Sequence, residues 1–186
     1  LAEWSQDADG RDQYRDSRDL VYFPQIMTVE PQERRIIRVG TRLPPPERER
    51  SYRLFIEEMP EPDETRGKGT QVAVKLRFGV PLFVAPLEPQ AAAVLERVEL
   101  AHGELTVDVR NGGNRHVKVD GISVSANGSV IGETTGWYVL PGVVRSFTLP
   151  LPAEACAAAG TIELLVAGSP QLQLQRTLDV APDRCR

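Results

Sequence analysis

The sequence is poor in the residues from which most catalytic and metal centres are built. Its 186 residues include two histidines and two cysteines, and a zinc site of the usual kind would need nearly all of them, which no spacing supports. His102 and His116 stand apart from any nucleophile motif, and the chain contains neither a Gly-x-Ser-x-Gly turn nor a phosphate-binding loop. These absences predict a protein that is not an enzyme and that holds no metal and no cofactor.

Long apolar runs and a positive net charge are also missing. The longest apolar run, residues 80–87, is interrupted by Pro81 and Pro86, whereas a membrane-spanning helix needs about 18 uninterrupted residues or more. The formal net charge is −4, so the chain lacks the basic surface of a nucleic-acid-binding protein. The first residues carry no signal segment, so we expect any export signal to be absent from this chain.

The sequence is rich in short stretches in which apolar and polar residues alternate. This is the period of a half-buried strand, and turn residues separate the stretches at the intervals of a β-sandwich. The only helix-like stretch, residues 153–159, is one or two turns long and ends at Gly160. Strands are predicted around residues 52–56, 70–80, 105–109, 117–119, 122–124, 147–151, 162–166 and 172–174. We therefore predict an all-β fold.

A stiff hinge is predicted at residues 85–90, because Pro86 and Pro89 remove backbone donors and bias their neighbours toward extended geometry. Residues 91–186 contain enough candidate strands for a complete immunoglobulin-like sandwich. Residues 1–86 contain four or five, which is fewer than a sandwich needs. The chain is therefore predicted to form two domains, 1–86 and 91–186, the first being either a smaller sheet or incomplete at its N-terminus.

Several groups of residues occur in a familiar order and spacing. They are Asp-Leu-Val-Tyr-Phe-Pro at 19–24, Val-Glu-Pro at 29–31, Ile-Arg-Val at 37–39, Tyr-Arg-Leu at 52–54, Glu-Glu-Met-Pro at 57–60, Leu-Arg-Phe-Gly-Val-Pro at 76–81, Gly-Trp-Tyr-Val-Leu-Pro-Gly at 136–142 and Phe-Thr-Leu at 147–149. Together they resemble the PapD-like periplasmic pilus chaperones over almost the whole chain. The residues at 136–149 resemble the archaic, spore-coat-U-associated branch in particular.

The resemblance implies two immunoglobulin-like domains set as a boomerang, and a non-enzymatic chaperone of the periplasm. Such chaperones capture pilin subunits and deliver them to an outer-membrane usher. A pilin lacks one strand, and the G strand of the chaperone's first domain, residues 70–80 here, lends it alternate apolar side chains by strand addition. Trp4 is similar to a tryptophan near the end of the family's third strand, so we expect the first strands, and with them the family's cleft arginine, to be absent.

The residues assigned to this donor strand are Thr70, Val72, Val74 and Leu76. Periodicity alone favours a strand that faces the protein's own core, whereas the resemblance favours the donor strand. The two interpretations are compatible if the upstream half projects from an edge of the sheet while the downstream half packs on the core. An exposed apolar edge invites aggregation, so its presence in this chain would indicate a protected use.

Arg77 is assigned as the anchor of the pilin's terminal carboxylate, with Lys75 as the second candidate. The family's cleft lysine falls on Leu76 when counted back from Pro81, one residue out of register. The alternation places Lys75 and Arg77 on the face opposite Leu76, and an arginine can hold a carboxylate by two parallel hydrogen bonds. The alternative is an ordinary solvated face of the strand.

Arg38 and Glu49 occupy positions that resemble an arginine and a glutamate that join the two domains of the family through an ion pair. The third partner would be an aspartate of the second domain, for which Asp179 and Glu154 are the unmatched candidates. The alternative is a plain surface ion pair, which contributes less than about 1 kcal/mol.

Cys156 and Cys185 are predicted to form a disulfide from the arithmetic of a hairpin. Residues 162–166 and 172–180 read as two arms folded about Ser169 and Pro170, and residues that face each other across that turn have numbers that sum to 339–341. The two cysteine numbers sum to 341, which places them opposite each other at the open end of the hairpin. A bridge there would stabilise the chain by about 3 to 4 kcal/mol and fits an oxidising compartment. The alternative is two unrelated thiols.

Two other functional classes compete with the chaperone. An extracellular adhesive or carbohydrate-binding sandwich would use exposed aromatic side chains such as Trp4 and Trp137, although packing is the ordinary role of a sandwich tryptophan. A hydrolase on a β-sandwich lacks a catalytic constellation. The alternating carboxylates of residues 7–12 suggest calcium, but their spacing departs from that of an EF-hand and favours a tight turn.

Overall fold

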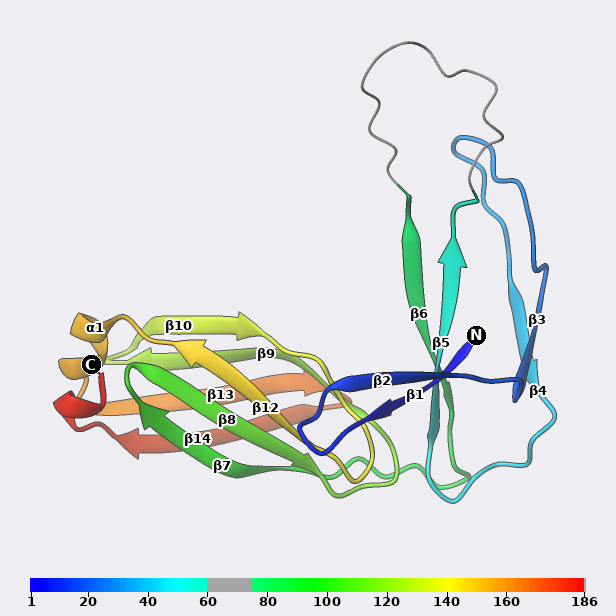
Figure 1. The fold of residues 1–186 in the computed structure, drawn as a ribbon. Helices are drawn as coiled ribbons and strands as arrows, with labels where there is room; N and C mark the ends of the chain where they lie inside the picture. The colour runs from blue at the N-terminus through cyan, green and yellow to red at the C-terminus, as the bar shows by residue number, and fades with distance from the viewer. Residues whose placement is uncertain (60–74, 186) are drawn as a thin grey trace, which may run out of the picture.

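The computed structural model describes residues 1–59 and 75–185 and divides them into two lobes. The first lobe contains strands β1 to β6, and the second contains β7 to β14, one short α-helix and one 3-10 helix. Both lobes are elongated and meet at one end at a sharp angle, which gives the chain the shape of a boomerang (Figure 1). The prediction of an all-β, two-lobed, immunoglobulin-like fold is confirmed.

The first lobe is built from one four-stranded sheet and one two-stranded sheet. The larger sheet has the order β2-β1-β5-β6 and the smaller pairs β3 with β4, all antiparallel. The strands are β1 (Ala2–Gln6), β2 (Asp12–Asp16), β3 (Leu20–Phe23), β4 (Arg38–Thr41), β5 (Arg50–Glu57) and β6 (Arg77–Val84). Within the described residues β6 pairs with β5 alone, so its other edge is free.

The first lobe differs from the sequence prediction in two respects. It has six strands, whereas four or five were predicted. The sequence pattern gave too few because β1 to β4 are short and show little alternation of apolar and polar residues. The strand predicted at 70–80 is described only from residue 75 onward; there it begins at Arg77 and continues through Pro81 to Val84. Pro81 lacks a backbone N–H. It is tolerated on this edge strand because that position of the backbone can face away from the neighbouring strand, where no donor is needed. The proposed donor residues Thr70, Val72 and Val74 lie outside the described residues.

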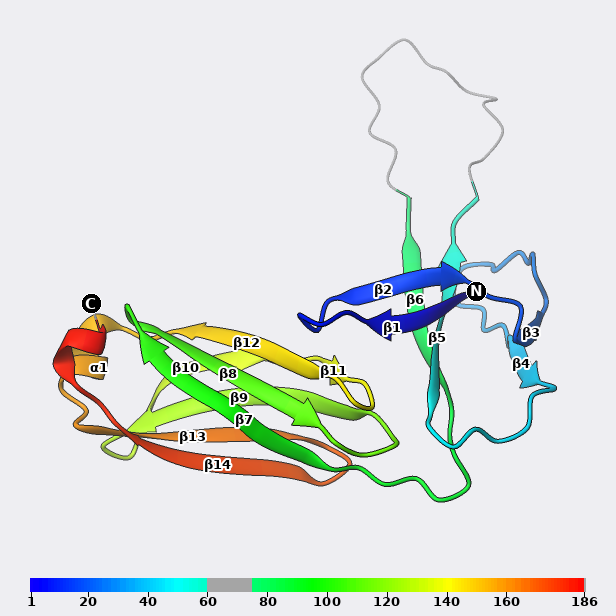
Figure 2. The same cartoon turned by 60° about the horizontal axis from the view of Figure 1, so that its bottom comes forward.

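The second lobe is a closed sandwich. One sheet has the order β10-β9-β13-β14, with β11 also paired to β9, and the other has the order β12-β8-β7 (Figure 2). The elements are β7 (Ala93–Ala101), β8 (Glu104–Asn111), β9 (Val117–Ala126), β10 (Ser129–Thr135), β11 (Tyr138–Val139), β12 (Val144–Pro150), α1 (Ala153–Ala157), β13 (Thr161–Ser169), β14 (Leu172–Asp179) and the 3-10 helix η1 (Pro182–Cys185). Side chains of both sheets form one core, and Leu105, Val119 and Ile162 are fully buried in it.

The two short strands predicted at 117–119 and 122–124 are one strand, β9. Its pairing with β13 skips Asp120, because Ala167 pairs with Gly121 whereas Gly168 pairs with Val119. One extra residue reverses the alternation of side chains, so Val119 and Ile122, three positions apart, both point into the core. The sequence pattern therefore suggested a turn where the chain has a β-bulge.

The predicted disulfide is present at the open end of the β13–β14 hairpin. Facing residues of this hairpin, from Thr161 and Asp179 to Gly168 and Leu172, have numbers that sum to 340, within the predicted range. Cys156 on α1 and Cys185 on η1 are bonded with their Cα atoms 5.8 Å apart, and both are buried. The bridge pins the end of the chain against α1.

Neither described helix is long or apolar enough to cross a membrane.

Candidate functional site

The free edge of β6 presents apolar side chains to solvent. Leu76, just before the strand, is 52% exposed, and Phe78 and Val80 are 59% and 39% exposed. The first four residues of β6 are exposed and the last four are half-buried. The expectation that the downstream half of the strand packs on the core is therefore wrong for residues 77–80. In the described residues the exposed apolar edge includes Phe78 and Val80, which the sequence interpretation did not name among the donor residues.

Arg77 lies on the opposite face of β6 from Phe78. Its Nε is 2.9 Å from Oε1 of Glu57, and its guanidinium lies 4.1 Å from the ring centroid of Phe55. The side chain remains 60% exposed. Lys75 is exposed and precedes the strand, so the pleat of β6 does not fix it on the face of Arg77.

A shallow hollow of about 520 Å³ lies beside Arg77. Its lining consists of Leu1, Ala2, Tyr14, Asp16, Phe55, Glu57, Arg77 and Gly79. One cation and two carboxylates line it, so the bare hollow carries no excess of positive charge. A ligand carboxylate would have to compete with Glu57 for the guanidinium.

Glu49 joins the two lobes, but its partner is not Arg38. Glu49 is buried, and its Oε1 lies 2.6 Å from Nδ1 of His116 and accepts a hydrogen bond from the backbone N–H of the same residue at 3.0 Å. The backbone N–H of Glu49 also donates to the carbonyl of Asn114 at 2.8 Å. Arg38 is exposed on β4, opposite Phe23. The expected pair of Arg38 with Glu49 is replaced by a pair of Glu49 with a histidine of the second lobe.

An aromatic cluster fills the joint between the lobes. It consists of Trp4, Phe83, His116, Trp137 and Tyr138. The rings of Phe83 and His116 stack at 3.8 Å, and those of Trp4 and Tyr138 meet edge to face at 5.3 Å. Trp4 is 2% exposed, so it packs in the joint and cannot serve as a platform for a sugar.

Arg53 lies inside this joint although it is charged. Its side chain starts from β5 and places the guanidinium 4.1 Å from the ring of Trp4 and 5.3 Å from that of Trp137. Its Nη1 donates a hydrogen bond of 3.2 Å to the carbonyl of Gly79 in β6. Arg53 is 5% exposed. The position of this charge therefore depends on residues of both lobes.

Asp12, at the start of β2, collects donors from both lobes. Gln6 and Trp137 donate to its carboxylate at 3.0 and 2.8 Å, and Arg145 donates at 3.2 Å. Burial by itself would raise the pKa of Asp12, but these hydrogen bonds and the charge of Arg145 outweigh burial, so the pKa lies below its ordinary value of 3.8. The charged form of Asp12 is therefore the one that holds the lobes together.

The carboxylates of residues 7–12 form a turn, as their spacing favoured. Asp7 Oδ1 accepts hydrogen bonds from the backbone N–H groups of Asp9 and Arg11 at 3.0 and 2.9 Å. The turn packs on the second lobe, where the carbonyl of Gly10 accepts a hydrogen bond from Arg145 Nη1 at 2.7 Å. A Cβ atom on Gly10 would lie 2.9 Å from the Cα of Arg145. Only glycine fits this contact.

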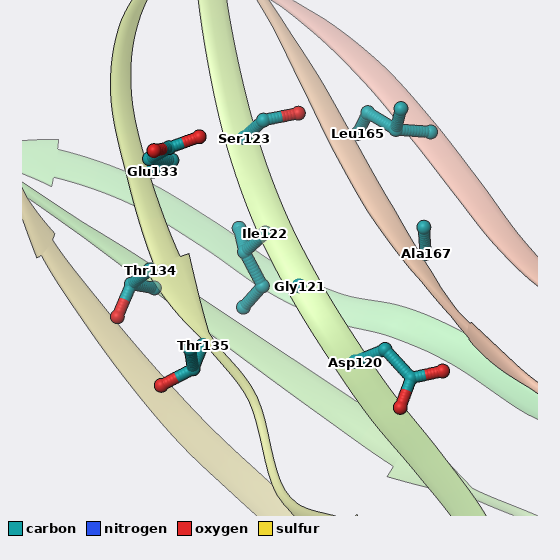
Figure 3. Close-up of a pocket in the computed structure, with 9 residues that line it drawn as sticks. All are labelled: Asp120, Gly121, Ile122, Ser123, Glu133, Thr134, Thr135, Leu165 and Ala167. Atoms are coloured by element: carbon teal, nitrogen blue, oxygen red, sulfur yellow. The ribbon is translucent and has the colours of Figure 1, made fainter.

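A second hollow lies on the outer face of the sheet in the second lobe. Figure 3 shows it along β9, β10 and β13, with Glu133, Ser123 and Leu165 around it. Its volume is about 550 Å³. Within the described residues, no group of three or more histidine, cysteine, aspartate or glutamate side chains is placed to hold a metal ion. This hollow therefore has the size of a binding site but few side chains that could take part in chemistry.

The sequence interpretation missed the residues that make the joint, apart from Glu49. Arg53 alternates with apolar neighbours in β5, so the pattern assigned it to solvent. His116 was examined only as a catalytic residue, and Asp12 only as a calcium ligand. The one usable signal was Trp137 within the Gly-Trp-Tyr motif at 136–138, because a tryptophan on a turn needs a packing partner.

Comparison with known proteins fits this geometry. Residues 1–90 match the family described as pili and flagellar-assembly chaperone, PapD N-terminal domain. The first lobe therefore matches the N-terminal domain of the PapD-like pilus assembly chaperones, a family of chaperones and not of enzymes. The archaic branch remains a prediction.

Solved structures of fimbrial chaperones share the fold of the whole chain. The class 5 fimbriae chaperone CfaA is 15% identical, with a TM-score of 0.51, and the match covers 97% of this chain and 83% of that one. The CupB2 chaperone of Pseudomonas aeruginosa is 18% identical, with a TM-score of 0.51, and the match covers 97% and 87%. No curated protein matches the chain.

Proposed function

We propose that this protein is a periplasmic chaperone that binds pilin subunits by donating a strand, and that it passes them to an outer-membrane usher. The observation that carries the proposal is the free edge of β6, where Leu76, Phe78 and Val80 expose apolar side chains at alternate positions. A partner that lacks one strand could pair with this edge through main-chain hydrogen bonds and receive those side chains in its groove. The match of residues 1–90 to the pilus chaperones supports this use of the edge.

The proposal includes the roles that the sequence suggested for individual residues. Thr70, Val72, Val74 and Leu76 would continue the apolar edge upstream of β6. Arg77, with Lys75 second, would anchor the terminal carboxylate of the pilin, because its exposed guanidinium lies on the face opposite the apolar side chains. Residues 1–86 and 91–186 would be the two domains, and the second would stay folded when the edge is altered.

The experiment compares two equally exposed apolar residues on two edge strands. Phe78 on β6 is 59% exposed, and Val130 on β10, an edge strand of the second lobe, is 60% exposed. Phe78→Asp should abolish recovery of a co-expressed pilin subunit from periplasmic extracts, whereas Val130→Asp should leave it unchanged. Equal recovery with both variants would refute strand donation by β6.

The anchor is tested in the same assay. Arg77→Ala should lower recovery of the pilin more than Lys75→Ala does. Equal losses, or a larger loss for Lys75→Ala, would assign the anchor to another residue while leaving strand donation in place.

A further inference from the structure

The accessible edge of β6 ends at a defined point along the strand. Residues 77–80 are exposed, whereas residues 81–84 are half-buried. The change occurs where β6 enters the joint, because the ring of Phe83 stacks on His116 of the second lobe at 3.8 Å. The open stretch of this edge is therefore the first half of β6.

The backbone of β6 shows which groups face a partner. Pro81 pairs with Arg53 of β5 and has no N–H, so this is a pair without mutual hydrogen bonds. Hydrogen-bonded and non-hydrogen-bonded residue pairs alternate along two antiparallel strands. The pairing of β5 with β6 contains no shift in register, so this alternation continues along the whole strand. The N–H and C=O groups of Arg77 and Gly79 therefore also point away from β5, toward the free edge.

Arg53 occupies the last acceptor on that edge. Its Nη1 donates to the carbonyl of Gly79 at 3.2 Å, and the next outward-facing residue, Pro81, offers no donor. No described residue accepts a hydrogen bond from Nε or Nη2 of Arg53, although both atoms are buried. A buried guanidinium with a single hydrogen bond is costly, and the rings of Trp4 and Trp137 offset only part of that cost. Stability of the first lobe alone does not explain its position.

We propose that Arg53 and Pro81 together form a stop that fixes the register of a strand added to β6. The partner is an extended, apolar segment of a pilin subunit, and the inference rests on the proposed strand donation. Such a segment forms main-chain hydrogen bonds with Arg77 and with the N–H of Gly79. Pairing stops there, because the carbonyl of Gly79 already accepts a hydrogen bond from Arg53 and Pro81 has no N–H to donate. Trp137, from the second lobe, covers Arg53 and holds the stop at the joint.

The register can be read by hydrogen exchange of single backbone amides in the unaltered protein. The probe is a fimbrial pilin subunit, co-expressed and purified with the full chain. We expect the amides of Arg77 and Gly79 to exchange at least about tenfold more slowly in the complex than in the free chain. The amide of Phe83, which also points away from β5, should not slow further.

Substitutions then remove the two parts of the stop. Pro81→Ala supplies the missing donor, but Arg53 still occupies the acceptor, so the boundary should stay at Gly79. Arg53→Met with Pro81→Ala frees both groups, and protection should extend to residue 81. Arg50→Met is the matched control, because Arg50 is an exposed arginine of the same strand that faces Asp19, and it should leave the boundary unchanged.

The outcomes separate this inference from the proposed function. If no amide of β6 slows on adding the subunit, strand donation itself fails. If Arg77 and Gly79 slow but protection already reaches Phe83 in the unaltered chain, the stop is refuted and strand donation stands. An unchanged boundary in the folded double variant refutes it equally, and if that variant does not fold, the boundary in the unaltered chain and in Pro81→Ala still decides.

Discussion

The two lobes bury apolar side chains to very different extents. In the second lobe twenty-one apolar residues are buried, and two sheets close on them from both sides. In the described part of the first lobe five are buried, and eleven large apolar side chains are exposed, among them Val21, Phe23 and Phe78. Burial of apolar surface is the main favourable contribution to folding, so among the described residues the second lobe has much the larger stabilising core.

The difference indicates that contacts with the second lobe stabilise the first. Trp4 and Arg53 of the first lobe are nearly fully buried, and aromatic rings of the second lobe lie against both. Asp12 and Glu49 likewise find their partners in the second lobe. We therefore expect the first lobe to depend on the second, while the second does not depend on the first. An uncovered apolar edge in the first lobe is also what a strand-donating chaperone requires.

The largest effect should come from opening the disulfide of the independent lobe. Cys156→Ser together with Cys185→Ser removes a cross-link across 29 residues and should lower the free energy of unfolding by about 3 to 4 kcal/mol. Urea unfolding followed by circular dichroism measures the loss, with the unaltered chain under reducing conditions as a second route to the same state. A midpoint that does not move would show that the bridge contributes nothing to this lobe.

A smaller effect should distinguish the two apolar surfaces directly. Leu105→Ala, at a fully buried position in the second lobe, should cost about 3 kcal/mol. Phe23→Ala, at a position 71% exposed in the first lobe, should change the free energy of unfolding by less than about 0.5 kcal/mol. Equal costs would mean that the face of Phe23 is covered in solution, and the contrast between the lobes would then be wrong.

The docking of the first lobe is tested by two glycines with the same backbone conformation. Gly10 has φ +75 and its Cβ would clash with Arg145, whereas Gly128 has φ +77 and nothing within 4 Å. Gly128→Ala should cost about 1 kcal/mol from backbone strain alone. Gly10→Ala should cost about 1 kcal/mol more and loosen the joint, which small-angle scattering would record as a larger radius of gyration. Identical behaviour of the two variants would show that the turn does not hold the lobes together.

The smallest effect is a dependence of the joint on acid. The pKa of Asp12 is lowered in the folded chain, so its contribution to stability is complete above the ordinary pKa of 3.8 and is lost as the pH falls through the lower, folded value. Fluorescence of Trp4 and Trp137 should therefore change in strong acid. In Asp12→Asn the acid-dependent change should be smaller, and an acid transition identical to that of the unaltered chain would rule out Asp12 as its source.

The sequence by itself determined the fold class and the disulfide. These follow from local rules: a period of two for strands, and a constant sum of residue numbers for the hairpin that brings Cys156 and Cys185 together. The family resemblance added the similarity to pilus chaperones, which the match of residues 1–90 supports. In each case residues near one another in the sequence, or an ordered set of motifs, contain the information.

Only the tertiary structure decided what lies in the joint and where the edge of β6 ends. Arg53 alternates like a solvent-facing residue, and it is buried because Trp137, 84 positions away, packs over it. His116 replaced Arg38 as the partner of Glu49 for the same reason. Contacts between residues distant in the chain leave no periodic trace in either strand, so the pattern of one strand cannot reveal what the other lobe places against it.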